Sequence, residues 1–203
     1  MTARNNQVKS KIGIFGATFD PPHLAHFVAA ETVALKIGLD KVLFIPAYIN
    51  PFKRGDQTAP VEARLKMVES VVKDNPLFEL CRLELERGGV SYMIDTAAEL
   101  RDEYPEDKYD FYLLIGADTV ADFHLWKDYR RLAEATRVTV FNRPGYDLAE
   151  VSEKLDVRHI TVTIPALEIS STMIRKNIVS HLPYRYFLPD PVYKIIITDG
   201  LYR

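Results

Sequence analysis

The chain has 203 residues, of which 47% are hydrophobic and 27% are charged, and its formal net charge is −2. This length fits one domain over residues 1–203, and the balanced charge excludes the broad basic surface that bulk nucleic-acid binding needs. The single cysteine, Cys81, excludes an internal disulfide framework and suits a reducing compartment, where we expect it to be a core residue. No apolar run approaches the ~20 residues of a membrane span, and the first ten residues lack the apolar centre of a signal peptide. We therefore expect a cytoplasmic protein with a loose tail at residues 1–9 and without a membrane partner, and a homo-oligomer is compatible with this composition.

The first predicted elements are a strand, a turn and a helix. Residues 12–15 are rich in β-favouring side chains, and the turn contains Gly16, Asp20 and two prolines. A helix is predicted from about residue 23 to residue 37, because its apolar residues fall mostly on one side. A strand, a glycine turn and a helix in this order point backbone N–H groups at an anion such as a phosphate.

Two histidines stand in the first turn of this predicted helix. His23 and His26 are three residues apart, so their imidazoles share a face and could offer positive charge to a polyphosphate. The alternative is a half-built metal site. Zinc sites need three or four ligands, and the sequence has no further Cys/His cluster to complete one.

The next elements are a strand, a loop, a helix and a short strand. Lys41–Pro46 is predicted to be a buried strand, and the polar loop after it lies where open α/β sheets bind ligands. Lys53 and Arg54 in this loop either contact a phosphate or form a solvated basic pair. Residues 60–74 have the spacing of a helix, and the alternation over 77–85 predicts a short strand with an extension.

The middle of the chain predicts a helix and then a central strand. Ser91 is a plausible N-cap for a helix that ends near Glu103, and residues 109–115 form an apolar, β-favouring run. That run ends in Gly116 and Asp118. An acidic residue at this position either binds a ribose hydroxyl or caps a helix.

The remaining elements continue the alternation. We expect Trp126 and Tyr129 on a short helix, strands over 135–141 and 158–164, a small helix over 147–155 and a final helix near the C-terminus. Strands that alternate with helices throughout predict an α/β fold: a doubly wound, mostly parallel, Rossmann-like sheet with helices on both faces.

One further segment combines hydroxyls with a cation. Ser170, Ser171 and Thr172 open a predicted helix, and Arg175 follows one turn later. The hydroxyls are good helix caps. Together with free amides and the guanidinium, they also form a plausible anion site.

Two of these segments carry a family resemblance. G-A-T-F-D-P-P-H-L-A-H at residues 16–26 resembles the G-G-T-F-D-P-x-H-x-G-H signature of the HxGH nucleotidyltransferase superfamily, with Ala17 and Ala25 where glycine is usual. I-S-S-T-x-I-R at residues 169–175 is similar to the second signature of that superfamily.

Other stretches resemble the bacterial nicotinate-mononucleotide adenylyltransferases within that superfamily. These stretches are S-Y-M-I-D-T at 91–96, L-I-G-A-D-T at 114–119 with the downstream Trp126, R-P-G at 143–145 and L-P-D-P-V-Y at 188–193. Met93 stands where that family usually has threonine. The pantetheine-phosphate adenylyltransferases share both superfamily signatures, but they are shorter and are not expected to have the G-A-D…W pattern.

The resemblance implies an enzyme of NAD biosynthesis that transfers AMP from ATP to nicotinate mononucleotide and releases deamido-NAD and pyrophosphate. It implies catalytic roles for His23, His26 and Arg175. It also implies Mg²⁺ held mainly by the ATP phosphates, with no dedicated metal site on the protein. The further ATP-binding residues that it implies are Gly16, Ala17, Thr18, Phe19, Gly116, Asp118, Ile169, Ser170, Ser171 and Thr172. The mononucleotide-binding residues that it implies are Lys53, Tyr92, Met93, Trp126 and Arg143.

Three alternatives stay open on the sequence alone. The enzyme could use nicotinamide mononucleotide or another phosphate acceptor, and Met93 makes this preference harder to predict. A non-catalytic nucleotide sensor could use the same cleft. An NAD-dependent dehydrogenase would need G-x-G-x-x-G after the first strand, where this chain has F-G-A-T-F-D.

Overall fold

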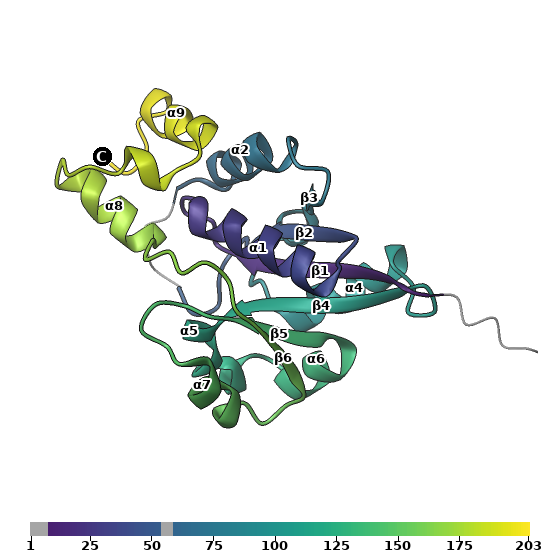
Figure 1. Ribbon diagram of the computed structural model, residues 1–203. Helices are drawn as coiled ribbons and strands as arrows, with labels where there is room; N and C mark the ends of the chain where they lie inside the picture. Colours follow the sequence, from purple (N-terminus) through teal and green to yellow (C-terminus); the bar gives the residue numbers. More distant parts are fainter. Residues whose placement is uncertain (1–7, 54–58) are drawn as a thin grey trace, which may run out of the picture.

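The computed structural model describes residues 8–53 and 59–203. Most of the predicted loose tail at residues 1–9 lies outside the described residues, and so does Arg54. Within them the chain forms a six-stranded parallel sheet with helices on both faces (Figure 1). The prediction of a doubly wound, Rossmann-like α/β fold is confirmed.

The sheet has the strand order β3-β2-β1-β4-β5-β6. The strand bounds are β1 Ser10–Ala17, β2 Lys41–Pro46, β3 Phe78–Leu80, β4 Tyr109–Gly116, β5 Arg137–Phe141 and β6 His159–Val162. Strands β1, β2 and β3 follow one another toward one edge of the sheet, and strands β4, β5 and β6 follow one another toward the other edge. The direction of strand order therefore reverses between β1 and β4. In open parallel sheets, a crevice for ligands forms beyond the carboxyl ends of the strands at such a switch point.

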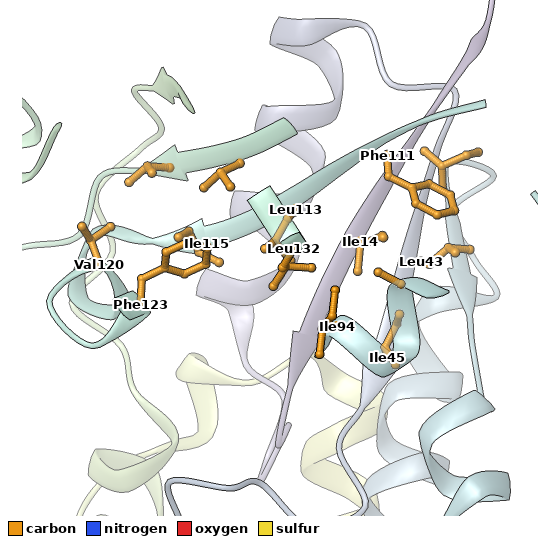
Figure 2. Packing of buried hydrophobic residues seen from close by; sticks show 14 of the residues in the cluster. Ile14, Leu43, Ile45, Ile94, Phe111, Leu113, Ile115, Val120, Phe123 and Leu132 are labelled. Atoms are coloured by element: carbon orange, nitrogen blue, oxygen red, sulfur yellow. The ribbon is translucent and has the colours of Figure 1, made fainter. Parts of the chain in front are cut away.

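Alternating side chains of the strands build a core on each face of the sheet. Ile12 and Ile14 of β1 point to one face, where they pack with residues of α4 (Met93–Glu103), α6 (Tyr129–Ala135) and α7 (Leu148–Lys154). Figure 2 shows Ile14 in this cluster with Ile94 of α4 and Leu132 of α6. Phe15 points to the other face, which α1 (Leu24–Ile37) and α2 (Val61–Val72) cover. Because both faces are buried, the central strands are apolar almost throughout.

The C-terminal helices form a third cluster beside the sheet. α8 (Ser171–Val179) and α9 (Asp190–Thr198) pack against Ala25 at the start of α1 and Met67 of α2. In Figure 1, α9 lies beside α2, and α8 lies near the start of α1. This packing brings the second predicted motif to the start of α1, where the first predicted motif ends. The short elements that complete the fold are α3 Leu83–Arg87, α5 Ala117–Val120, and the 3₁₀ helices Phe123–Leu125 and Arg185–Phe187.

Several local predictions are wrong. The strand predicted over 77–85 ends at Leu80, because the chain turns into α3 at Leu83. Ser91 does not cap α4, since the cap residue is Tyr92 and the Ser91 hydroxyl accepts the Tyr48 N–H at 2.9 Å. Trp126 ends a 3₁₀ turn and does not lie within a helix. Cys81 is half-buried at the edge of a core cluster.

None of the helices in the described parts of the chain is both long enough and apolar enough to cross a membrane.

Candidate active site

Two adjoining hollows open beyond the carboxyl ends of β1 and β4. The first, about 370 Å³, lies over the start of α1 and the end of β4. The second, about 300 Å³, lies between the start of α4 and Trp126. They share five lining residues, which are Gly16, Ala17, Asn50, Phe52 and Trp126. Two ligands could therefore meet above the end of β1, which suits a reaction between two substrates.

The histidine pair stands in the first hollow at the start of α1. The Nδ1 atom of His26 accepts the backbone N–H of His23 at 3.1 Å, and this bond caps the helix. The accepting Nδ1 atom leaves the ring proton of a neutral His26 on Nε2. The two imidazoles stack with their centroids 3.7 Å apart. One backbone hydrogen bond thus fixes both the ring and its tautomer.

Both histidines are neutral in the free protein. Burial lowers the pKa of His23 to about 3, and the nearby Arg143 guanidinium adds to this effect. Burial also lowers the pKa of His26, as do the charges of His23, Arg143 and Lys53. The expectation that the imidazoles provide positive charge is therefore wrong for the resting protein. They can act as neutral N–H donors, while Lys53, Arg143 and Arg175 provide the charge.

The hydroxyls at the start of α8 hold this helix against the first motif. Ser170 caps α8 by accepting the Met173 N–H at 3.1 Å, and the Ser171 hydroxyl donates to the Pro21 carbonyl at 2.8 Å. Arg175 donates from Nη1 to the Asp20 carbonyl at 2.7 Å. Beside these contacts lies a hollow of about 60 Å³, lined by Ala17, Thr18, Phe19, Asp20, His26, Lys53, Ser171 and Arg175. Its backbone and cationic groups suit a phosphate.

A further hollow of about 270 Å³ runs from Asp118 to the start of α8. Asp118 faces Arg143, with 3.7 Å between carboxylate oxygen and Nε, and Arg143 donates to the Ile169 carbonyl at 3.3 Å. Asp118 lies inside α5, whose cap residue is Gly116, so the capping alternative for Asp118 is wrong. A Cβ at Gly116 would come within 2.3 Å of the Asp118 carboxylate, so the missing side chain makes room for this arrangement.

The second hollow has an aromatic and aliphatic lining. Tyr92, Met93 and Trp126 line it together with the exposed side chains of Phe52 and Leu125. Met93 follows the cap residue of α4, so its backbone N–H lies in the first turn, where helix amides have no partner inside the helix. Its methyl group lies against the end of β1, because a Cβ at Gly16 would be 2.3 Å from it.

The structure brings almost every site residue predicted from the sequence to the lining of these hollows. The hollows described above are lined by Gly16, Ala17, Thr18, Phe19, His23, His26, Lys53, Tyr92, Met93, Gly116, Asp118, Trp126, Arg143, Ile169, Ser170, Ser171 and Arg175. Thr172 lines none of these hollows. It is exposed, and its hydroxyl accepts a long hydrogen bond of 3.4 Å from Arg175. The roles of these residues stay predictions.

Sequence reasoning missed a polar network beneath the site. Arg64 of α2 is 1% exposed and donates to the carbonyls of Thr18 and Ala47 at 2.8 and 2.7 Å. It thereby ties the loop after β1 to the loop after β2. Asp20, also buried, accepts hydrogen bonds from the Ala59 amide and from the Tyr202 hydroxyl. Asp20 lies inside the first motif and could have been suspected, whereas nothing local marks Arg64 or Tyr202.

The described residues contain no group of three or more His, Cys, Asp or Glu side chains that could hold a metal ion. Within residues 8–53 and 59–203, the pair His23 and His26 has no further ligands of the kind that a zinc site would need.

Comparison with known proteins gives a consistent family. Residues 14–177 match the model of the cytidylyltransferase-like family. The nicotinate-nucleotide adenylyltransferase of Bacillus subtilis is 36% identical over 193 residues, which cover 95% of this chain and 98% of the relative. A protein of Roseiflexus sp. named "Probable nicotinate-nucleotide adenylyltransferase" is 41% identical over 197 residues, again with 95% and 98% coverage.

Solved structures share the fold. Nicotinic acid mononucleotide adenylyltransferase of Plasmodium falciparum, complexed with NaAD, superposes with a TM-score of 0.79 over 95% of this chain and 97% of the other, at 18% identity. At that identity the likeness concerns the fold alone. The family model and the curated relatives each span most of the chain, and both agree with the two motifs at the site. This chain therefore belongs to the cytidylyltransferase-like nucleotidyltransferases and, among them, to the nicotinate-nucleotide adenylyltransferases.

Proposed function

We propose that this chain transfers AMP from ATP to nicotinate mononucleotide. An oxygen of the mononucleotide phosphate attacks the α-phosphorus of ATP, the bond from that phosphorus to the bridging α–β oxygen breaks, and pyrophosphate leaves with deamido-NAD as the second product. The observation that carries the proposal is the pair of hollows that meet above the end of β1, beside the two histidines. The names of the curated relatives support this choice of substrates.

The acceptor phosphate is already a nucleophile, so the site needs no serine or cysteine nucleophile and no strong base. Its task is to hold two anions in line and to stabilise charge that develops on the α-phosphate and the leaving group. In this proposal the Nε2–H of His26 donates to the α-phosphate, and His23 donates to a neighbouring phosphate oxygen. Arg175 offsets the charge of the polyphosphate from the hollow beside α8. Lys53, which the family resemblance assigns to the mononucleotide, lines this hollow and the first hollow, so in this proposal it faces the phosphates where the two substrates meet.

The remaining contacts follow from the lining of the hollows. Asp118 would accept hydrogen bonds from the ATP ribose, and Ile169 and Ser170 would border the nucleotide. Trp126 would stack on the pyridine ring, while the first-turn amides of α4 would face its carboxylate.

Mg²⁺ would enter with ATP, held mainly by the phosphates and by water. The donors at the site suit this arrangement, since the described residues offer no cage of their own. When bound, the ion would offset charge on the β- and γ-phosphates. We also place the protein in the cytoplasm, in keeping with its single cysteine, and assembly into a homo-oligomer remains a prediction.

One assay tests the proposal. The protein is mixed with ATP, Mg²⁺ and nicotinate mononucleotide, and pyrophosphate and the dinucleotide product are quantified together. Equimolar release of both products is expected. A protein that binds ATP but releases no pyrophosphate would instead be a nucleotide sensor. Faster turnover with nicotinamide mononucleotide would overturn the assignment of the acceptor.

A further inference from the structure

The last residues of the chain contact the first motif. The Tyr202 hydroxyl donates a hydrogen bond of 2.7 Å to Oδ1 of Asp20, and the ring of Tyr202 packs against the third apolar cluster. Asp20 is 2% exposed. Burial and the Asp20 carboxylate both raise the pKa of Tyr202, so its hydroxyl stays protonated and remains a donor.

The same aspartate lies beside Arg175. Its backbone carbonyl accepts the Nη1 hydrogen bond of Arg175 at 2.7 Å, and its Oδ2 lies 3.7 Å from the same nitrogen. Within the parts of the chain that the structure describes, Oδ2 has no hydrogen-bond partner. The buried carboxylate is therefore incompletely satisfied, and Arg175 is a cation within its reach.

This arrangement makes Asp20 a competitor for the cation that would bind phosphate. A buried carboxylate with fewer hydrogen bonds attracts a nearby guanidinium more strongly, because both charges are poorly solvated there. Two donors limit that attraction by satisfying Oδ1, the Ala59 amide at 3.0 Å and the Tyr202 hydroxyl. The Ala59 amide is part of the backbone, so Tyr202 is the donor that a substitution can remove.

We infer that Tyr202 is a positioning residue for ATP: its hydroxyl satisfies the buried Asp20 carboxylate and thereby leaves the Arg175 guanidinium available to the polyphosphate. The inference rests on the proposed function, in which Arg175 contacts the ATP phosphates. It assigns the C-terminal end of the chain a role in ATP affinity, although Tyr202 lines none of the hollows of the site.

The first test compares Tyr202→Phe with the wild type. Phenylalanine keeps the ring in the apolar cluster and removes only the hydroxyl. We expect KM for ATP to rise by about three- to tenfold, the range for the net contribution of one ordinary hydrogen bond, because the lost bond acts on ATP only through Arg175. KM for nicotinate mononucleotide and kcat should change by less than about twofold, because Tyr202 acts through the phosphate-binding arginine alone. Tyr186→Phe is the matched control, since Tyr186 is 86% exposed, and it should leave all three constants unchanged.

The second test asks whether Tyr202 acts through Arg175. ATP binding is measured by calorimetry without the acceptor, in the wild type, Tyr202→Phe, Arg175→Ala and the double variant. The effect of Tyr202→Phe on ATP affinity should be absent in the Arg175→Ala background, because without Arg175 there is no guanidinium for Asp20 to attract. An equal loss in both backgrounds would mean that Tyr202 only stabilises the fold, and it would overturn the inference.

These measurements separate the inference from the proposed function. If the wild type releases no pyrophosphate, the proposed reaction fails, while the calorimetric cycle still measures the coupling between Tyr202 and Arg175. If the wild type is active and Tyr202→Phe binds ATP as the wild type does, the inference alone is wrong.

Discussion

The phosphate side of the site and the acceptor side are built in different ways. On the phosphate side, His23 and Asp20 are 3% and 2% exposed, and hydrogen bonds to the backbone fix most of the polar groups. On the acceptor side, Phe52 and Leu125 are 51% and 58% exposed. Polyphosphate recognition requires donors whose positions are set in advance, because reorganisation would cost binding energy. A flat ring requires apolar surface, which can stay exposed until the ring covers it.

The largest effect is expected where the phosphate side is most rigid. Arg64→Met should lower the free energy of unfolding by about 3–5 kcal/mol, because it leaves buried carbonyls of Thr18 and Ala47 without their donor. Urea unfolding measures the change. Arg82→Met is the control, since Arg82 forms a half-exposed ion pair with Glu69 and should contribute at most about 1 kcal/mol. Equal losses in the two variants would mean that the buried network does not stabilise the loops.

The next effect concerns chemistry on the phosphate side. His26→Ala should lower kcat by at least ~10²-fold, the scale for losing one preorganised donor to the transition state. KM for ATP should change less, because the cations remain. His124→Ala is a suitable control, as His124 is exposed and lines none of the hollows described. Near-normal turnover in His26→Ala would refute the catalytic role of this ring.

The two sides also differ in how far the sequence predicts them. The phosphate side lies in two short motifs, and strand–turn–helix patterns bring residues such as His23 and Ser170 to the correct ends of their helices. The supporting residues Arg64 and Tyr202 could not be predicted, because their hydrogen-bond partners lie far away in the sequence. The residues next to Arg64 show only a helical pattern, and those next to Tyr202 show no motif. On the acceptor side, the sequence predicted Ser91 as the N-cap of α4, but the N-cap is Tyr92. The Ser91 hydroxyl instead accepts a hydrogen bond from Tyr48 in the neighbouring loop.

The protonation states were beyond sequence reasoning for a physical reason. Spacing places His23 and His26 on one face, but only the packed structure shows that burial and nearby cations keep them neutral. The sequence thus predicted which residues gather at the site but not their charge.

A third prediction uses this neutrality to probe the phosphate side. The pKa of His23 is about 3 in the folded protein, against about 6.5 in an unfolded chain, so between these values the unfolded state binds a proton that the folded state does not. The contribution of His23 to stability is therefore present above pH 6.5 and is lost as the pH falls. Between pH 7 and pH 5 the wild type should lose about 2 kcal/mol more unfolding free energy than His23→Gln. Urea unfolding at both pH values measures this difference, and equal losses in the two proteins would contradict the buried, neutral state.

The smallest effect is expected on the acceptor side, at Met93. The amides at the start of α4 favour a carboxylate, so the wild type should prefer nicotinate over nicotinamide mononucleotide. Methionine provides no hydroxyl, and its methyl group fills space beside Gly16 that a threonine would leave open. Met93→Thr could add one donor to the carboxylate of the ring. A hydroxyl stabilises a carboxylate by about 1 kcal/mol more than it stabilises a neutral amide, so the ratio of kcat/KM for the two acceptors should shift toward nicotinate by about fivefold.

Trp126→Ala is the matched control for this change. Stacking on the ring does not depend on whether the ring carries a carboxylate or an amide, so this variant should raise KM for both acceptors and leave their ratio nearly unchanged. An unchanged ratio in Met93→Thr would mean that position 93 contacts the ring only through its backbone. A wild-type preference for the amide would refute the donor-lined acceptor side itself. If both variants behave as expected, Trp126 provides affinity for the ring, and the first turn of α4 provides the selectivity between carboxylate and amide.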